Sequence, residues 1–180
     1  MKIIKILAVM ALCACIAACG NRQKKTEAEP AAETQDMSQY MPGVKSGSPA
    51  PALELNTPDG VTVRLSDYVG KGKYILLDHW ASWCGPCKAE IPAIRKAYDA
   101  FKGDRFDVVS IACSDKREDT VKALSELDMP WNQILDAQKI PVELYGVATI
   151  PHLILFAPDG TILKRGLRGE QIYSTLQELL

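Results

Sequence analysis

The sequence predicts an α/β fold, with a mixed central β-sheet flanked by helices. Two nearly continuous apolar runs, at 74–80 and 106–112, have the length and composition of central strands buried on both faces, and a segment with helical character follows each. A Pro-Asp-Gly turn also occurs twice, at 58–60 and 158–160, each time between two short strand-like segments. Strands that alternate with helices favour parallel pairing and hairpins are antiparallel, so the sheet should contain both.

The elements before the first long strand are a hairpin and one helical turn. Residues 52–55 and 61–64 alternate between apolar and polar side chains around the first Pro-Asp-Gly turn, which predicts an N-terminal β-hairpin extension. Residues 65–68 are expected to form a short helical turn.

A helix over about 85–102 is expected after the first long strand. Its apolar residues recur at helical spacing, at Ile91, Ile94, Tyr98 and Phe101. Pro92 lies inside this helix and should kink it, because its ring removes a donor and crowds the preceding turn.

The second half of the chain continues the alternation of strands and helices. After the strand at 106–112, Asp115 and Glu118 have the spacing of a capping box, which predicts a helix through Leu127. The elements expected after it are a short helix, a second hairpin and a final helix, at 142–145, at 152–156 with 161–165, and at 169–180.

Composition and charge argue against two classes of protein. Of the 180 residues, 47% are hydrophobic, which is ample for a core and excludes a wholly disordered chain. The 21 basic and 22 acidic residues give a net charge of -1, which argues against a nucleic-acid binder that neutralises phosphates. Six cysteines are too few for a disulfide-built scaffold, so their positions decide what they do.

Residues 1–18 are typical of a secretory signal peptide. Two lysines precede an uncharged apolar run, 6–18, which is shorter than the roughly 20 residues that a membrane span needs. The sequence Ile-Ala-Ala-Cys-Gly at 16–20 resembles a bacterial lipoprotein box, with Ile in place of the favoured Leu. That resemblance implies cleavage before Cys19 and lipidation of its thiol, whereas an ordinary signal peptide cut at a nearby site is the alternative.

Residues 19–45 are expected to form a flexible linker between the lipidated Cys19 and a domain at 46–180. The stretch is polar and has almost no large aliphatic side chain, so it cannot bury enough apolar surface to offset its ordering entropy. A chain with this organisation lies on the extracytoplasmic (periplasmic) side of a bacterial membrane, lipid-anchored to it, where disulfides persist.

Two cysteines stand where a buried strand gives way to a helix. Cys84 and Cys87 are separated by two residues, which brings both sulfurs within disulfide reach on the first helical turn. Free backbone N–H groups and the helix dipole stabilise a thiolate there, so Cys84, which should be more exposed, is expected to attack and Cys87 to resolve the mixed disulfide. An inert structural disulfide is one alternative, and a zinc site, which needs two further ligands, is another. The remaining candidate ligands are Cys113, His79 and His152.

The residues around this pair resemble a known fold. The sequence Trp-Cys-Gly-Pro-Cys-Lys at 83–88, with Thr-Ile-Pro at 149–151, resembles the thioredoxin fold. Further segments resemble the extracytoplasmic TlpA/ResA-like thiol-disulfide oxidoreductases, at 47–51, 59–60, 65–68, 70–71 and 80–83. The resemblance covers about Gly47 to Leu180 and implies a thioredoxin-like domain.

The resemblance also implies substrate-binding residues. Pro151 would be a cis-proline facing the cysteines, and it would expose the backbone of Ile150, which in the family pairs with the substrate main chain. A trans proline in a turn is the alternative. Trp83 should shield the disulfide and touch substrates, although it could simply pack, and Pro86 belongs to the same surface.

Two acids are implied to act beside the cysteines. Asp78 falls where thioredoxins carry a buried acid under the resolving cysteine, although many members of this branch have Asn there; its raised pKa would suit proton exchange with Cys87. Glu90 matches an acid that ResA-like proteins place beside their cysteines. The alternatives are a core polar residue satisfied by hydrogen bonds for Asp78 and a solvated helix surface for Glu90.

Three further residues have open roles. His79 stands where the family usually has Phe, and His152 stands where Thr or Ser is common. Because their strands are neighbours in a thioredoxin-like sheet, the two histidines could approach each other and titrate near neutral pH, or they could be two unrelated buried histidines. Cys113 is expected to be a small hydrophobic core residue, with a regulatory disulfide as the alternative.

The function predicted from these residues is reduction of disulfides in protein substrates by a membrane-anchored thiol-disulfide oxidoreductase. The pair Gly85-Pro86 resembles reducing thioredoxins, and a reductant outside the cell membrane implies a transmembrane electron donor. No metal and no cofactor beyond the cysteine couple is expected. One alternative is a peroxiredoxin-like thiol peroxidase, which the start at Ala50-Pro51 imitates, although the Pro-x-x-x-Thr-x-x-Cys loop is absent around Cys84. The other is a non-catalytic binding lipoprotein.

Overall fold

The computed structural model describes residues 46–50, 53–56, 61–135 and 137–180. The expected signal peptide, the lipidated Cys19, the linker and the first Pro-Asp-Gly turn lie outside these residues. Within them, no helix is long and apolar enough to cross a membrane.

The centre of the domain is a mixed sheet of five strands in the order β5-β4-β3-β6-β7. These strands are β3 Tyr74–Trp80, β4 Phe106–Ala112, β5 Asn132–Ile134, β6 His152–Phe156 and β7 Ile162–Arg165. β3, β4 and β5 are parallel, whereas β6 is antiparallel to both β3 and β7. The predicted mixed sheet is therefore confirmed, and β5 is a strand that the sequence pattern does not predict.

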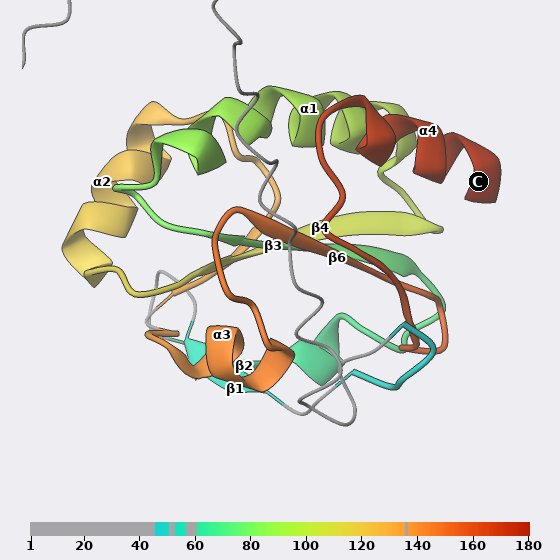
Figure 1. Ribbon diagram of the computed structural model, residues 1–180, viewed down its shortest axis with the longest axis horizontal. Coiled ribbons are helices and arrows are strands. Elements are labelled where there is room, and N and C mark those ends of the chain that lie inside the picture. Colours follow the sequence, from blue (N-terminus) through green and yellow to red (C-terminus); the bar gives the residue numbers. More distant parts are fainter. Residues whose placement is uncertain (1–45, 51–52, 57–60, 136) are drawn as a thin grey trace, which may run out of the picture. The chain divides into compact units, whose positions relative to one another are not determined.

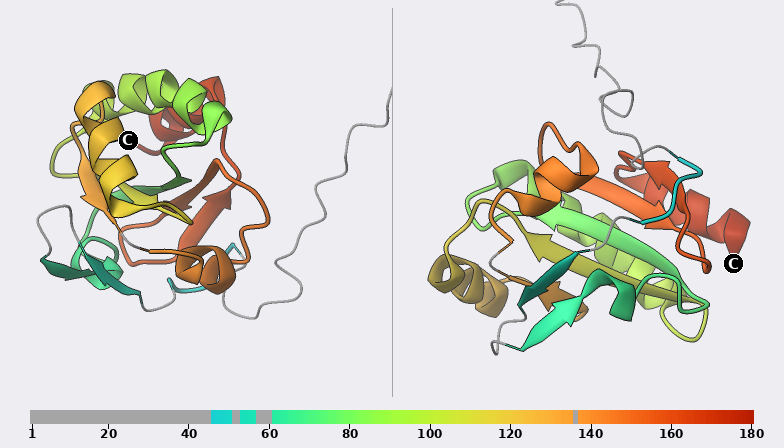
Figure 2. Two further views of the ribbon diagram at one scale, coloured as in Figure 1. Left: turned by 90° about the vertical axis from the view of Figure 1, so that its left-hand side faces the viewer. Right: turned by 90° about the horizontal axis from the view of Figure 1, so that it is seen from below.

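Helices cover both faces of this sheet (Figure 1). They are α1 Gly85–Phe101, α2 Arg117–Glu126, α3 Ile140–Tyr145 and α4 Glu170–Leu179, with a 3-10 turn at Leu65–Asp67. Helices α1, α2 and α4 lie on one side, and α3 lies on the other with the hairpin of β1 Glu54–Asn56 and β2 Thr62–Arg64, as Figure 2 also shows. This arrangement, with the hairpin as an N-terminal extension, is the thioredoxin-like fold that the sequence predicts.

Burial on both faces explains why the central strands read as continuous apolar runs. In β3, Leu76 and Trp80 belong to the core beneath α1, whereas Ile75 and Leu77 belong to the core beneath the hairpin. Alternation along the strand places Asp78 on the α1 side and the residue after it on the hairpin side. Asp78 and the residue after it therefore face different cores.

The N-terminal segment is tied to the second Pro-Asp-Gly turn. The N–H of Ala50 donates to the carbonyl of Gly160 at 3.0 Å, and the N–H of Gly47 donates to the carbonyl of Ile162 at 2.7 Å. Gly160 has a φ of 91°, a backbone conformation that residues with a side chain rarely adopt. This positive φ favours glycine at the turn.

The predicted capping box is wrong. The residue that caps α2 is Lys116, which has no side-chain capping bond, and the helix begins at Arg117 and ends at Glu126. The carboxylate of Asp115 is engaged elsewhere, because it accepts hydrogen bonds from Ser82. The kink expected at Pro92 stays a prediction, and α1 runs as one helix through that residue.

Candidate active site

The cysteine pair occupies the first turn of α1, as the spacing predicts. Cys84 is the N-cap residue, with φ -82° and ψ 98°, and Cys87 lies one turn into the helix. Their sulfurs are joined in a disulfide, with the two Cα atoms 5.2 Å apart, and the N–H of Cys87 donates to the Cys84 Sγ at 3.2 Å. Pro86 fits the first turn because the N–H groups there have no partner within the helix. The free N–H groups of this turn can therefore stabilise a thiolate on Cys84.

The disulfide is covered, and the residues around it are exposed. Cys84 is 4% exposed and Cys87 is 2% exposed, so the expected difference has the right sign but is small. Gly85 and Pro86 lie on the surface, and Trp83 is 62% exposed. A partner that reaches the sulfurs would therefore also meet Trp83.

Hydrogen bonds from neighbouring loops hold the segment before Cys84. The Nε1 of Trp83 donates to the carbonyl of Ser114 at 3.0 Å, and the Ser114 N–H donates to the carbonyl of Gln138 at 2.8 Å. Ser114 has a φ of 50°, a strained value for a residue other than glycine. The exposed indole is thus anchored by its polar end while its ring remains available for contact.

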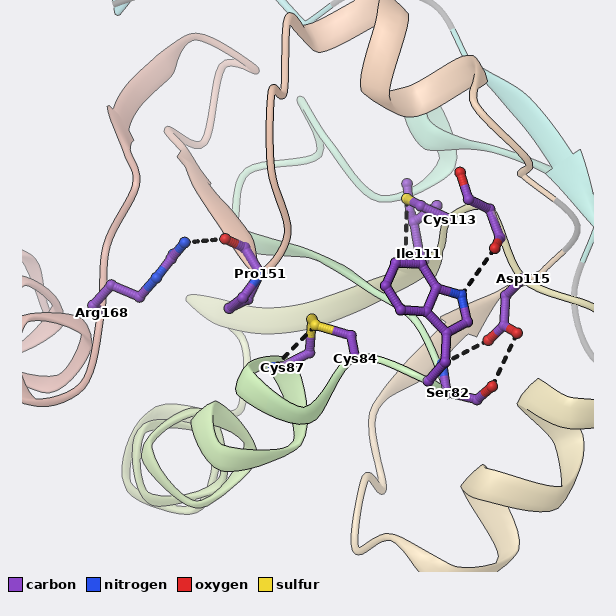
Figure 3. The surroundings of a disulfide bond; sticks show 10 residues. Ser82, Cys84, Cys87, Ile111, Cys113, Asp115, Pro151 and Arg168 are labelled. Carbon is purple, nitrogen blue, oxygen red and sulfur yellow. Dashed lines mark hydrogen bonds between the residues drawn. A yellow bond between two sulfur atoms is a disulfide. The ribbon is translucent and has the colours of Figure 1, made fainter. Parts of the chain in front are cut away.

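Asp115 is a site-supporting residue that the sequence analysis assigned to another role. Its buried carboxylate accepts hydrogen bonds from the N–H of Ser82 at 2.6 Å, the Ser82 Oγ at 2.9 Å and the Thr120 Oγ1 at 2.9 Å, and also from the N–H of Lys116 at 2.9 Å. Figure 3 shows Asp115 and Ser82 beside the disulfide. The available signal was an acid three residues after the end of a buried strand, but its spacing to Glu118 also fits a capping box.

Pro151 has the predicted cis peptide bond. The Ile150–Pro151 bond is cis, and Pro151 precedes β6, the strand that pairs with β3. In Figure 3 its ring faces the disulfide across the end of α1. A groove of about 340 Å³ adjoins it and is lined by Trp83, Cys113, Ser114 and residues 147–150. Trp83 and Ile150, two of the predicted substrate-binding residues, therefore share one groove.

Asp78 is a buried acid with a raised pKa, as predicted. It is 2% exposed, and its Oδ2 accepts a hydrogen bond from the Ser110 Oγ at 2.9 Å. Burial raises the pKa of Asp78 to about 7, against the lowering effects of the Ser110 hydrogen bond and of the positive charge of Arg168, and the charge of Glu90 raises it further. Asp78 can thus gain or lose a proton near neutral pH.

Glu90 lies one turn beyond Cys87 and is held by the turn before α4. Its Oε1 accepts a hydrogen bond from the N–H of Gly169. The side chain is half-buried, so the alternative of a fully solvated helix surface does not describe it. Its charge acts on the pKa of Asp78, which places both predicted acids in one electrostatic neighbourhood on the α1 side of the sheet.

The two histidines approach each other, and burial lowers the pKa of both. His79 and His152 are paired across β3 and β6, with ring centroids 6.2 Å apart and the His79 Nδ1 2.9 Å from the carbonyl oxygen of His152. Burial lowers the pKa of His79 to about 4 and that of His152 to about 3. These lowered pKa values favour the alternative of two buried histidines over a pair that titrates near neutral pH, with His79 fully buried and His152 half-buried.

Cys113 is a buried free thiol, as expected for a small hydrophobic residue. It is 1% exposed, and burial raises the pKa of its thiol to about 12. Among the described residues, no three His, Cys, Asp or Glu side chains are placed to hold a metal ion.

Comparison with known proteins places this site in a family. The AhpC/TSA family matches residues 46–165. The thioredoxin domain of a thiol-disulfide oxidoreductase from Bacteroides vulgatus is 37% identical, with a TM-score of 0.69, over 75% of this chain and 97% of that chain. The thiol-disulfide oxidoreductase ResA of Bacillus subtilis is 28% identical over 121 residues, which is 67% of this chain and 66% of ResA. The exposed lipoprotein thioredoxin Etrx1 of Streptococcus pneumoniae is 30% identical, with a TM-score of 0.59, over 71% of this chain and 99% of that chain.

A cysteine disulfide on the first turn of a helix, opposite a cis-proline on a mixed sheet, is the arrangement of a thioredoxin-fold thiol-disulfide oxidoreductase, and these relatives agree with it. The chain belongs to the AhpC/TSA family. The resemblance to ResA-like proteins found in the sequence is confirmed.

Proposed function

We propose that this chain is an extracytoplasmic, membrane-anchored protein-disulfide reductase. The observation that carries the proposal is the Cys84–Cys87 disulfide at the N-terminus of α1, facing cis-Pro151 with an exposed indole beside it. Substrate class, direction of electron flow, anchoring and partners all belong to this proposal.

The reaction starts from the reduced pair. The Cys84 thiolate attacks one sulfur of a client disulfide, which forms a Cys84–client bond and releases the other client sulfur as a thiolate that takes a proton from solvent. The Cys87 thiolate then attacks the Cys84 sulfur and releases the second client sulfur. Two electrons pass to the client, and the chain is left with the Cys84–Cys87 disulfide.

Asp78 is proposed to take the proton that Cys87 must lose before the second step. A group with a pKa of about 7 can accept a proton at neutral pH and return it when the pair is reduced again. Burial is the main cause of this raised pKa, and the charge of Glu90 adds a smaller raising effect.

Clients are proposed to bind across Trp83, Pro86, Ile150 and Pro151. The exposed ring of Trp83 offers apolar contact area, and the Ile150 backbone beside the cis bond offers main-chain hydrogen bonds. The adjoining groove accommodates an extended segment next to the disulfide.

The direction of the reaction is inferred from Gly85 and Pro86, the pair that reducing thioredoxins carry between their cysteines. A reductant outside the cytoplasm needs electrons from within, so a transmembrane electron donor is proposed as the upstream partner. Lipidation at Cys19 would anchor the chain to the membrane, and the likeness to a streptococcal protein described as an exposed lipoprotein thioredoxin supports this proposal.

A thiol peroxidase is less consistent with the sequence around Cys84. The Pro-x-x-x-Thr-x-x-Cys loop would need Pro and Thr at 77 and 81, where this chain has Leu77 and Ala81. A non-catalytic binding protein would have no need for both cysteines and the cis-proline.

Reduction of insulin disulfides by the full chain, purified in detergent and supplied with dithiothreitol, tests the proposal. We expect turnover by the wild type, none by Cys84→Ser, and accumulation of a mixed disulfide with insulin by Cys87→Ser. A wild-type chain that consumes hydrogen peroxide but leaves insulin intact would contradict the proposal and favour the peroxidase.

A further inference from the structure

Two successive residues of the turn between β7 and α4 bond to two different parts of the redox site. The Nη2 of Arg168 donates to the carbonyl of Pro151, and the N–H of Gly169 donates to the Oε1 of Glu90 on α1. The Nη1 of Arg168 also donates to the carbonyl of Leu167 at 2.8 Å. The turn therefore connects the cis-proline segment to the helix that carries the cysteines.

The turn is itself fixed on both sides of Arg168. Leu167 is buried in the core beneath α1, and the N–H of Gly166 donates to the carbonyl of Leu153 in β6 at 2.8 Å. On the other side, a carboxylate oxygen of Glu170 lies 2.8 Å from the Nζ of Lys96 on α1. Arg168 thus reaches Pro151 from a turn that contacts both β6 and α1, and in Figure 3 it approaches on the side opposite Ser82 and Asp115.

We infer that Arg168 is a positioning residue of the redox site, which fixes the cis-Pro151 segment opposite the cysteines so that a client main chain can pair with it. A guanidinium is a planar fork of donors, so it can hold the carbonyls of Leu167 and Pro151 together, which an ammonium cannot do in the same geometry. The Pro151 carbonyl belongs to the peptide plane that follows the cis bond. Holding this plane limits the directions in which the backbone of Ile150 can point. The inference rests on the proposed function, because that function gives the Ile150 backbone its role in binding clients.

The test compares three variants of the full chain. Arg168→Met removes both guanidinium bonds, and Arg168→Lys keeps the charge without the fork. Arg105→Met is the matched control, since Arg105 also donates to two backbone carbonyls, those of Leu180 and Leu179, but at the end of α4.

Two measurements separate the inference from the proposed function. The first is amide hydrogen exchange of residues 149, 150, 152 and 153, which should accelerate at least about fivefold in Arg168→Met and stay unchanged in Arg105→Met. The second is insulin reduction, in which the KM of Arg168→Met should rise about tenfold while kcat changes less than about threefold, with Arg168→Lys between the two.

The outcomes are distinct. Unchanged hydrogen exchange in Arg168→Met would overturn the inference. Faster exchange with an unchanged KM would also overturn it, because Arg168 would then fix the segment without affecting how clients bind. A wild-type chain that reduces no insulin would instead contradict the proposed function, and the exchange measurement would still decide whether Arg168 fixes this segment.

Discussion

Replacing Asp78 with Asn should stabilise the oxidised protein, and the gain should grow as the pH rises. Burial is the largest cause that raises the pKa of Asp78 from 3.8 to about 7 in the folded chain. An acid with a raised folded-state pKa binds its proton more tightly in the folded state than in the unfolded state. The contribution of Asp78 to stability is therefore greatest below pH 3.8, falls as the pH rises toward 7, and then levels off.

The size of the effect follows from the two pKa values. At 1.36 kcal/mol per unit, the ionised carboxylate destabilises the fold by about 4 kcal/mol at pH 8 but by only about 2 kcal/mol at pH 5. The advantage of Asp78→Asn should thus be about 2–3 kcal/mol larger at pH 8 than at pH 5. How well Asn fits contributes equally at both pH values, and its amide oxygen can still accept the hydrogen bond of Ser110.

Urea unfolding of the oxidised full chain at pH 5 and pH 8 measures this difference. Asp119→Asn is the control, because Asp119 is an exposed acid in the first turn of α2 and its loss should change stability little at either pH. An equal gain for Asp78→Asn at both pH values, or no gain at pH 8, would refute the argument that Asp78 is buried with a raised pKa.

Three further substitutions test other parts of the site. Trp83→Phe keeps an aromatic ring but loses the bond to the Ser114 carbonyl, so the KM for insulin should rise about two- to fivefold in steady-state kinetics; an unchanged KM would show that the anchor is dispensable. His79→Phe should leave the pH profile of insulin reduction between pH 6 and 8 unaltered, because the pKa of His79 is lowered to about 4, and a lost titration step would contradict this. Asp115→Ala should reduce the free energy of unfolding in urea by about 2–4 kcal/mol, since four donors lose their acceptor, and Thr120→Val, which removes one of these donors, should have less than half that effect.

The long strands and the cysteine pair could be predicted because their signals are local. Strand β3 is buried on both faces, so its residues form a nearly continuous apolar run in the sequence. The spacing of Cys84 and Cys87 alone places both on one helical turn. Strand β5 was missed because it is an edge strand of three residues, Asn132–Ile134, that pairs only with β4. So short a segment is held by its neighbour rather than by a pattern of its own.

The supporting residues of the site could not be predicted because their partners are distant in the chain. Asp115 accepts a hydrogen bond from Ser82, and Arg168 donates one to Pro151. The sequence next to Asp115 or Arg168 contains no pattern that predicts either partner. The spacing of Asp115 and Glu118 fits a capping box, so the sequence predicted a capping role for Asp115 instead of its hydrogen bonds to Ser82. The lowered pKa values of His79 and His152 likewise depend on how deeply the two rings are buried. The pairing of neighbouring strands predicts that the rings approach each other, but it does not predict their burial.

The redox potential of the Cys84–Cys87 couple tests the central claim most directly. It is measured by equilibrating the full chain with glutathione buffers and quantifying free thiols on Cys84 and Cys87, with Cys84→Ser as the blank. A reductase should have a potential close to that of thioredoxin, about −270 mV. A potential near about −120 mV, typical of a strong oxidant, would contradict the proposed direction of electron flow.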